Sequence, residues 1–387
     1  MQNRLKGSKN FVDFYDSNQI MPVTQDLKNP MFQTRRKYLY RSLGIPLQFI
    51  KNMTVLEFGP GGGFNAHALS QDGPLKKYVC VEGSKVGQKL VKESFQDGKI
   101  KSDSFEIAQC DFLEFHSKEE FNLVIAEGCI PGQIDPRKTL KHISSFVEPS
   151  GYLVVTFVSR ASQLSELLRS VYSSALRTEI GDDKVHESII LKEFEKHLRQ
   201  LGTFTRSVED WVADNITQNL YERVASFSLF EGIQILHNFE FVHSNPQFIQ
   251  DLDWYKSYVP ENMARNKKIV DQYSRFDLSL LDIRIQSDDI SKLSDHQMSL
   301  MHEEIEKCYL IARNYMLGKG DKSVFQDLQK SCKNLSKVCA ELKIPTYRAL
   351  NEFADFFNSE VKSQFVFDEV SKWWGRGQQY ATFFRIR

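Results

Sequence analysis

Cysteine is scarce in this sequence, and its spacing suits neither a metal site nor a redox pair. Six cysteines occur in 387 residues. No two of them form a C-x-x-C pair and no histidines cluster beside them, so we expect no structural zinc and no other bound metal. Cysteines scattered through apolar segments are typical of reduced core thiols in an intracellular protein. The six are Cys80, Cys110, Cys129, Cys308, Cys332 and Cys339.

Long apolar runs and a surplus of charge are also missing. No run of about 18 apolar residues is present, so we expect no membrane span. Residues 1–16 lack the apolar stretch of a signal peptide, which favours a cytoplasmic protein. Fifty basic residues balance fifty acidic ones, giving zero net charge. Because enzymes that act on nucleic acid usually carry a basic excess, we expect no nucleic-acid partner.

Residues 53–158 alternate between short β-branched runs and segments with helical spacing. Strands that are apolar on both faces and alternate with helices indicate a parallel sheet covered on both sides. The pattern therefore predicts a doubly wound α/β fold. Its five expected strands are residues 53–58, 77–83, 105–111, 121–128 and 151–158.

The sequence after residue 158 changes character and is mainly helical, with apolar residues three and four apart. We expect large helical insertions, a further strand near 239–248, and a last strand that returns to the sheet. The predicted division has four parts: an N-terminal helical lid, a nucleotide-binding core, a helical substrate region and a terminal strand. Their ranges are 1–50, 51–160, 161–372 and 373–387.

The segment from Val55 to Gly63, VLEFGPGGG, is the most informative in the chain. A strand that ends in glycines and turns into a helix brings its backbone close to a ligand at the carboxyl edge of a sheet. A glycine-rich turn without a ligand is the simpler alternative. A dinucleotide loop would have a third glycine at position 64, where this chain has Phe64.

The loop instead resembles motif I of the class I S-adenosylmethionine-dependent methyltransferases, E/D-x-G-x-G-x-G. The pattern is matched by Glu57, Gly59, Gly61 and Gly63. The resemblance covers roughly residues 50–160. It implies a mostly parallel seven-stranded sheet with S-adenosylmethionine as cofactor, and those four residues as part of its site.

Two further acidic positions fit this resemblance. Glu82 ends the second expected strand, where a carboxylate can accept both hydroxyls of a ribose. Asp111, after the third strand, resembles the family's acidic residue beside the adenine amino group, and Phe112 would offer a ring or backbone contact. A helix N-cap and a core aromatic are the alternative readings of Asp111 and Phe112.

The fourth strand and the N-terminal segment supply the remaining candidates. The strand resembles the family's motif IV, although Asn122 stands where the family usually has Asp. Glu127 at its carboxyl end is the candidate catalytic base, or a residue that orients the cofactor's amino group. Tyr15 and Asp16 precede the sheet in an aromatic segment, and in this family such segments commonly cover the cofactor; packing onto the sheet edge is the simpler alternative.

The methyl acceptor is predicted from the residues just after the fourth strand. Enzymes that methylate nucleic-acid bases or glutamine amides resemble each other in an [N/D/S]-P-P-[Y/F] tetrad, and this chain has Glu-Gly-Cys-Ile at residues 127–130. We therefore expect methylation of oxygen or nitrogen on a small-molecule or sugar-type acceptor. Polar–aromatic groups that could hold a ring occur at 251–255 and 373–376, although core clusters explain such groups equally well.

Two other functions stay open at this point. An NAD-dependent dehydrogenase or epimerase would share the loop and the ribose carboxylate. Its Tyr-x-x-x-Lys pair is matched only by Tyr315 and Lys319, far from the expected position. A non-catalytic partner that kept the fold for structure is the third reading.

Overall fold

The structure is a computed structural model of the whole chain, which divides into two compact units. Unit 1 comprises Met1–Val158, Arg223–Tyr273 and Gln378–Arg387, and unit 2 comprises Ser159–Glu222 and Ser274–Gly377. The four-part division expected from the sequence stays a prediction. The structure describes residues 10–19, 25–202, 207–218, 220, 226–247, 254–257, 263–319 and 323–386.

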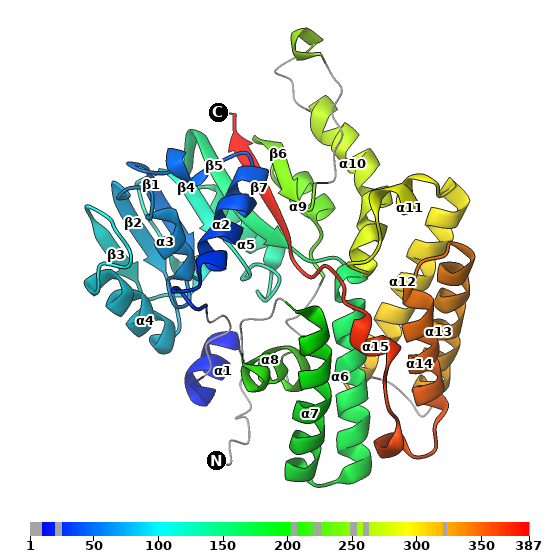
Figure 1. Cartoon of the computed structure of the whole chain (residues 1–387). Helices are drawn as coiled ribbons and strands as arrows, with labels where there is room; N and C mark the ends of the chain where they lie inside the picture. The colour runs from blue at the N-terminus through cyan, green and yellow to red at the C-terminus, as the bar shows by residue number, and fades with distance from the viewer. Residues whose placement is uncertain are drawn as a thin grey trace. The chain divides into compact units, whose positions relative to one another are not determined.

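Unit 1 is built on a seven-stranded sheet in the order β3-β2-β1-β4-β5-β7-β6 (Figure 1). Strands β1 to β5 pair in parallel, whereas β7 is antiparallel to both β5 and β6. The predicted doubly wound, mostly parallel fold is confirmed. The strands are β1 Thr54–Phe58, β2 Lys77–Val81, β3 Phe105–Ala108, β4 Phe121–Ala126, β5 Val147–Phe157, β6 Phe239–Asn245 and β7 Gln379–Arg385.

Burial on both faces explains why the central strands are apolar throughout. The neighbours Val55 and Leu56 point to opposite faces of the sheet and are both fully buried. One face packs against α2, α3 and α4 through a single apolar cluster. Helices α5 and α9 contact strands of the sheet without joining that cluster. The helices that lie within unit 1 are α1 Phe11–Asn18, α2 Pro30–Ser42, α3 Phe64–Leu69, α4 Lys85–Gln96, α5 Pro136–Ser144 and α9 Leu229–Ile235, with the short helices Leu47–Phe49, Phe112–Glu114 and Tyr255–Ser257.

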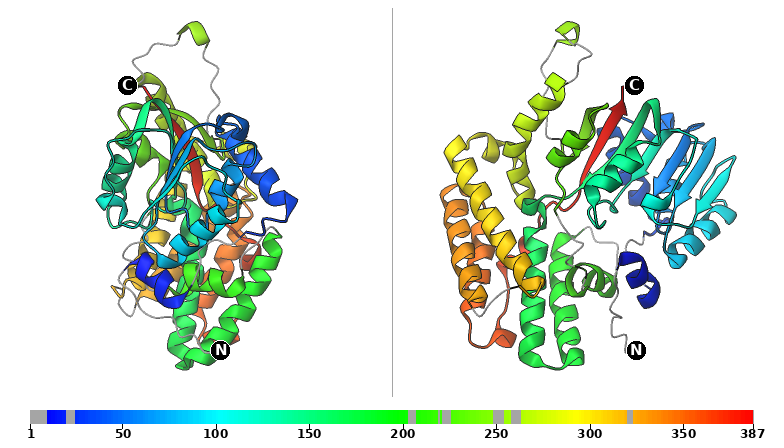
Figure 2. Two further views of the ribbon diagram at one scale, coloured as in Figure 1. Left: turned by 90° about the vertical axis from the view of Figure 1, so that its left-hand side faces the viewer. Right: turned by 180° about the vertical axis from the view of Figure 1, so that it is seen from behind.

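Unit 2 is helical, as the spacing predicts for these segments. Its helices α12, α13 and α14 lie side by side (Figures 1 and 2). They are α6 Arg160–Ile180, α7 Asp183–Leu201, α8 Val208–Val212, α11 Ser287–Ser291, α12 Asp295–Met316, α13 Val324–Glu341, α14 Thr346–Asn358 and α15 Glu369–Lys372, with short turns at Ala213–Thr217, Leu278–Leu281 and Lys362–Gln364; α10 Met263–Asp277 joins the two units.

A buried arginine organises the core of unit 2. Arg169 on α6 is only 1% exposed and donates to the carbonyls of Val370 and Trp373, at 2.7 Å each. Its guanidinium also lies 4.3 Å from the ring centre of Trp374. Burial lowers the pKa of Arg169 to about 9. These contacts fasten the segment around α15 to α6.

Several expectations about the chain as a whole can be compared with the structure. All six cysteines are free thiols, and four of them are buried. Among the described residues, no helix is long and apolar enough to cross a membrane. The cytoplasmic location stays a prediction.

Candidate functional site

The glycine loop lies at the carboxyl end of β1 and turns the chain into α3. Gly59, Gly61 and Gly63 all have positive φ angles, of 68°, 55° and 75°. Residues with a Cβ rarely adopt such angles, so the local backbone requires glycine. A Cβ on Gly59 would also lie 3.2 Å from the Cβ of Cys129 and 3.3 Å from Cζ of Phe112. The loop is therefore a tight backbone cradle at the edge of the sheet.

Glu82 follows β2, and its carboxylate reaches the glycine loop. One of its oxygens accepts from the Gly61 amide at 3.1 Å, and the other accepts from the Ser84 amide at 2.9 Å. Burial raises the pKa of Glu82, and the two backbone N–H groups oppose that rise. Helix α4 passes close behind it, since a Cβ on Gly87 would lie 2.9 Å from its carboxyl carbon. The predicted ribose carboxylate and the glycine loop are thus in direct contact.

Asp111 and Phe112 lie at the end of β3, as expected. Asp111 is exposed and caps the short helix Phe112–Glu114, because its carboxylate accepts from the Leu113 amide at 3.3 Å. Phe112 packs edge-on against Phe58, with ring centres 5.5 Å apart. The N-cap and aromatic contacts weighed as alternatives are therefore present. Their roles towards adenine stay a prediction.

Glu127, at the carboxyl end of β4, is held by two side chains of α2. The guanidinium of Arg36 donates to both of its oxygens, at 2.8 and 3.0 Å, and the Tyr40 hydroxyl donates at 2.7 Å. Burial alone would lower the pKa of Arg36, but the adjacent Glu127 outweighs it and raises that pKa. Glu127 is therefore one half of a bidentate ion pair rather than a solvated carboxylate.

Glu57 extends this network beneath the glycine loop. It is 2% exposed and accepts from Tyr78 on β2 at 2.7 Å and from Asn65 on α3 at 3.0 Å. Asn65 in turn accepts from Arg36. Burial raises the pKa of Glu57 to about 7, against the opposing effect of its two hydrogen bonds. The motif's acidic residue thus joins β1, β2, α2 and α3 behind the loop.

Helix α1 lies across the carboxyl edge of the sheet. Its Asp16 accepts from the Ser84 hydroxyl at 2.7 Å and from the amides of Lys85 and Val86, so it caps the start of α4. A Cβ on Gly83 would lie 3.0 Å from Val12, and one on Gly132 would lie 3.3 Å from Phe11. Helix α1 therefore contacts both the loop after β2 and the loop after β4.

Tyr15 belongs to the same helix. Its ring contacts those of Phe11 and Phe14, with centres 5.8 Å apart in each case, and Phe14 is buried. Its predicted role as a residue that covers the cofactor stays a prediction.

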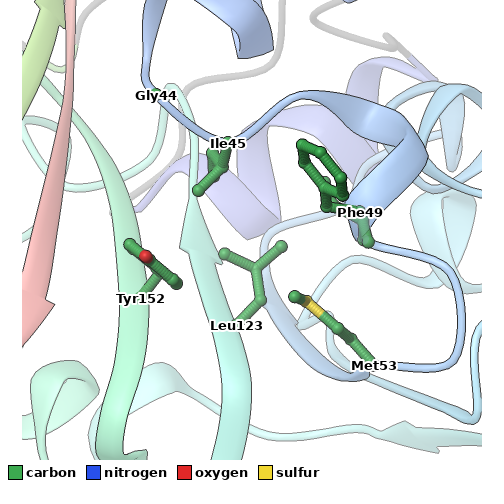
Figure 3. A pocket seen from close by; sticks show the side chains of 7 residues that line it. Gly44, Ile45, Phe49, Met53, Leu123 and Tyr152 are labelled. Atoms are coloured by element: carbon green, nitrogen blue, oxygen red, sulfur yellow. The ribbon is translucent and has the colours of Figure 1, made fainter.

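An apolar cavity of about 210 Å³ opens at the other end of the sheet (Figure 3). Met53 precedes β1, and Leu123 and Tyr152 are paired residues of β4 and β5. The cavity lies at the amino ends of the strands. It is therefore separate from the glycine loop, which follows the carboxyl end of β1.

The aromatic groups predicted as possible acceptor contacts, and one histidine, His186, differ in burial. His186 is buried, and its Nε2 lies 2.9 Å from the Ser173 carbonyl. Trp373 and Trp374 belong to the core of unit 2, which removes them from contact with an acceptor. Trp254 is 62% exposed and Tyr255 75%, while Asp251 lies outside the described residues.

Arg36, Tyr40 and Asn65 are the site residues that sequence reasoning missed. Arg36 and Tyr40 are four residues apart on α2 and so share a helix face. That spacing was available in the sequence, but nothing in it identified Glu127, 91 residues away from Arg36, as the partner.

The fold has the mostly parallel, seven-stranded α/β architecture that the resemblance to class I methyltransferases implied. The sheet is mostly parallel, with an antiparallel β7. A glycine loop follows β1, and buried or paired carboxylates follow β2 and β4. The acidic and glycine residues gather at one edge because the carboxyl ends of parallel strands meet there.

The comparison with family models agrees with that class. Residues 32–202 match the model of a methyltransferase domain. Residues 32–202 are therefore similar to a methyltransferase domain, and this similarity agrees with S-adenosylmethionine, the cofactor predicted from the sequence. A search of the curated proteins found no match.

Solved structures to which this chain is similar include methyltransferases. An S-adenosylmethionine-dependent methyltransferase from Clostridium acetobutylicum is 18% identical, with a TM-score of 0.27, and the match covers 31% of this chain and 48% of that one. The N-methyltransferase NodS from Bradyrhizobium japonicum, in complex with S-adenosylhomocysteine, is 19% identical with a TM-score of 0.29, covering 36% and 71%. PKMT2 from Rickettsia typhi is 15% identical with a TM-score of 0.40, covering 63% and 49%. The chain thus spans about half the length of the Clostridium and Rickettsia proteins.

The residues present fit the cofactor. The glycine cradle leaves little room for a Cβ at Gly59, and Glu82 offers carboxylate oxygens beside it. The buried Nε of Arg36 has no hydrogen-bond partner, so a cation at the end of β4 retains donor capacity. These residues would hold the ribose and the polar end of the cofactor.

Proposed function

We propose that this chain transfers the methyl group of S-adenosylmethionine to an oxygen or nitrogen atom of a small-molecule or sugar-type acceptor. The observation that carries the proposal is the hydrogen bond from the Gly61 amide to Glu82, which joins the ribose carboxylate to the glycine loop. The bound cofactor supplies a methyl group already activated by its sulfonium. The protein's task is then to align the acceptor and exclude water, which can supply roughly 7–11 kcal/mol.

Residues of the chain support these roles of binding the cofactor and excluding water. Glu82 would accept the ribose hydroxyls, and Asp111 would accept from the adenine amino group. Phe11 and Val12 of α1 lie over the loops after β4 and β2, where they would keep water from the bound nucleoside. Both carboxylate oxygens of Glu127 contact the Arg36 guanidinium, so an acceptor would have to displace that contact to reach them.

The proposed acceptor class is based on three features. Residues 127–130 lack the tetrad associated with nucleic-acid bases, and the net charge is zero. Trp254 and Tyr255 are exposed, with the Lys256 ammonium 4.9 and 5.8 Å from their ring centres. Exposed rings of this kind can stack on a sugar.

Calorimetric titration with S-adenosylhomocysteine and, separately, NADH tests the cofactor. We expect micromolar binding of S-adenosylhomocysteine, weakened at least about tenfold by Glu82→Gln, because a charge-assisted bond to a ribose hydroxyl is worth about 1.5–3 kcal/mol. Glu106→Gln is the matched control, since this β3 carboxylate is exposed and paired with Lys77.

A screen of small acceptors with radiolabelled methyl donor then tests transfer. Binding of NADH alone would overturn the methyltransferase proposal. A third outcome would favour the hypothesis of a non-catalytic partner protein. In that outcome the chain binds S-adenosylhomocysteine but methylates no acceptor, and its function survives Gly61→Arg.

A further inference from the structure

Positive charge is concentrated on α2 and the segment that follows it. Residues 27–56 carry six basic side chains and no acidic one, although the whole chain has zero net charge. Two of the six are paired with acidic residues of unit 1. Arg35, Arg41 and Lys51 are exposed and form no ion pair within the described part of the chain. They leave this part of unit 1 with a positive surface that the protein itself does not neutralise.

Exposed aromatic rings lie among these cations. Tyr38 is 58% exposed, and the Arg41 guanidinium lies 5.8 Å from its ring centre. Phe49 is 65% exposed. Arg35, Tyr38 and Arg41 are spaced three residues apart on α2 and therefore share one face of the helix. The Arg41 carbonyl accepts from the Gly44 amide at 3.1 Å, so this face continues into the turn that leads to Phe49.

The apolar cavity of about 210 Å³ opens beside Phe49 (Figure 3). Gly44 and Phe49 belong to its lining, together with other apolar side chains and the ring of Tyr152. Such a lining gives water few hydrogen-bond partners, and an apolar cavity of about 150 Å³ is large enough for benzene. The cavity therefore has room for one aromatic or branched aliphatic side chain.

We propose that this basic surface docks a segment of a partner protein in which one aromatic or branched apolar side chain is flanked by acidic residues. The apolar side chain enters the cavity, and the acidic residues meet the cations around it. An apolar anchor in a pocket with charges at its rim is an arrangement in which few residues dominate affinity and specificity. This α2 surface consists of the cavity and of Arg35, Tyr38, Arg41, Phe49 and Lys51.

Two other classes of partner fit the charge of the α2 surface but not its cavity. A nucleic-acid base in the cavity would bury its polar edges without hydrogen-bond partners, which is unfavourable. A bilayer presents a flat layer of headgroups and would leave the cavity empty. The cavity lies at the amino ends of the strands, away from the glycine loop, so the inference does not depend on the proposed methyl transfer.

Fluorescence polarisation with three labelled peptides tests the docking. The peptide EDEFEDE has one phenylalanine between acidic residues, EDEAEDE has alanine in its place, and KRKFKRK reverses the charges. We expect the wild type to bind EDEFEDE with a Kd of about 10–100 μM, EDEAEDE at least about tenfold more weakly, and KRKFKRK not at all. Because salt screens exposed charges, the Kd of EDEFEDE should rise at least about fivefold between about 0.05 and 0.5 M NaCl.

Variants of the α2 surface separate the roles of charge and cavity. Arg41→Glu should weaken EDEFEDE at least about tenfold, because it reverses one charge at the rim. Met53→Phe fills part of the cavity, and Phe49→Ala removes an exposed ring from its rim. Both should weaken EDEFEDE and leave the weaker binding of EDEAEDE unchanged. Lys141→Glu is the matched control, because Lys141 is exposed on α5. All four variants should keep the wild-type melting temperature and affinity for S-adenosylhomocysteine.

Three results would overturn the inference without touching the proposed function. The first is no binding of EDEFEDE at about 1 mM peptide. The second is equal affinity for EDEFEDE and EDEAEDE, because the cavity would then take no part. The third is binding of oligothymidylate, or of vesicles that contain phosphatidylserine, that is tighter than binding of EDEFEDE and is lost in Arg41→Glu. That third result would assign the surface to nucleic acid or to a membrane.

Discussion

Two side chains that are predicted cofactor contacts also make hydrogen bonds that stabilise the fold. Glu82 is a predicted ribose contact and also accepts hydrogen bonds from the amides of Gly61 and Ser84. Asp111 is a predicted adenine contact and also an N-cap. A side chain that backbone groups already hold in place loses little conformational entropy when a ligand binds.

Glu57 makes the stability of unit 1 depend on pH. Its carboxyl is buried and its pKa is raised to about 7 from 4.5, so the folded state favours the protonated form. That stabilising contribution is complete below pH 4.5 and is lost as the pH rises through about 7. Between pH 4.5 and 8 the wild type should therefore lose about 2–3 kcal/mol relative to Glu57→Gln.

Urea unfolding of the two proteins across this pH range measures the difference. Glu166 in unit 2, whose pKa burial also raises to about 7, contributes equally to both curves and cancels. Parallel stability curves for wild type and Glu57→Gln would show that folding leaves the pKa of Glu57 unshifted.

At the scale of elements, α1 is a short helix that buries little side-chain surface. It has eight residues and only Phe14 among them is buried. Asp16 of α1 caps the start of α4, because its carboxylate accepts from the Ser84 hydroxyl and from two backbone amides. Short elements with little buried apolar surface open locally at low free energy.

Removal of the contact between Asp16 and the start of α4 should loosen α1 without unfolding the sheet. We expect Asp16→Ala to cost about 1 kcal/mol, as for a lost helix cap, and to speed amide exchange at residues 10–19 and 84–87. Hydrogen exchange with mass spectrometry measures this directly. Asp13→Ala is the control, because Asp13 lies on the same helix and is exposed. Equal exchange in both variants would mean that apolar packing, not Asp16, holds α1.

At the scale of the whole molecule, the two units are interwoven along the chain. Unit 1 is completed by two segments that follow parts of unit 2 in the sequence. Its last strand, β7, lies between β5 and β6 and pairs with both. Ala381 and Phe383 of β7 are fully buried. Strand β7, Gln379–Arg385, is therefore an inner strand of the sheet of unit 1.

Removal of residues 378–387 should abolish folding of unit 1. The cut exposes an edge of β5 and separates β6 from the sheet, so we expect loss of cooperative unfolding and of S-adenosylhomocysteine binding. Circular dichroism and calorimetry check both. A chain that ends at Arg385 is the control, because it keeps β7. Wild-type affinity in the shorter chain would contradict this account of the sheet.

The sequence by itself determined the parallel sheet, the glycine loop and the position of Glu82, because these depend on local patterns. A strand buried on both faces must be apolar throughout, and a loop with positive φ requires glycine. Such rules act within a few residues, so they can be read along the chain.

Tertiary structure alone decided the partners of the charges. Arg36 and Glu127 are 91 residues apart, and only the docking of α2 beside β4 turns them into an ion pair. Likewise, only packing shows that Trp373 and Trp374 are core residues. The free energy of a buried charge depends on everything that surrounds it, and those surroundings come from distant segments of the chain.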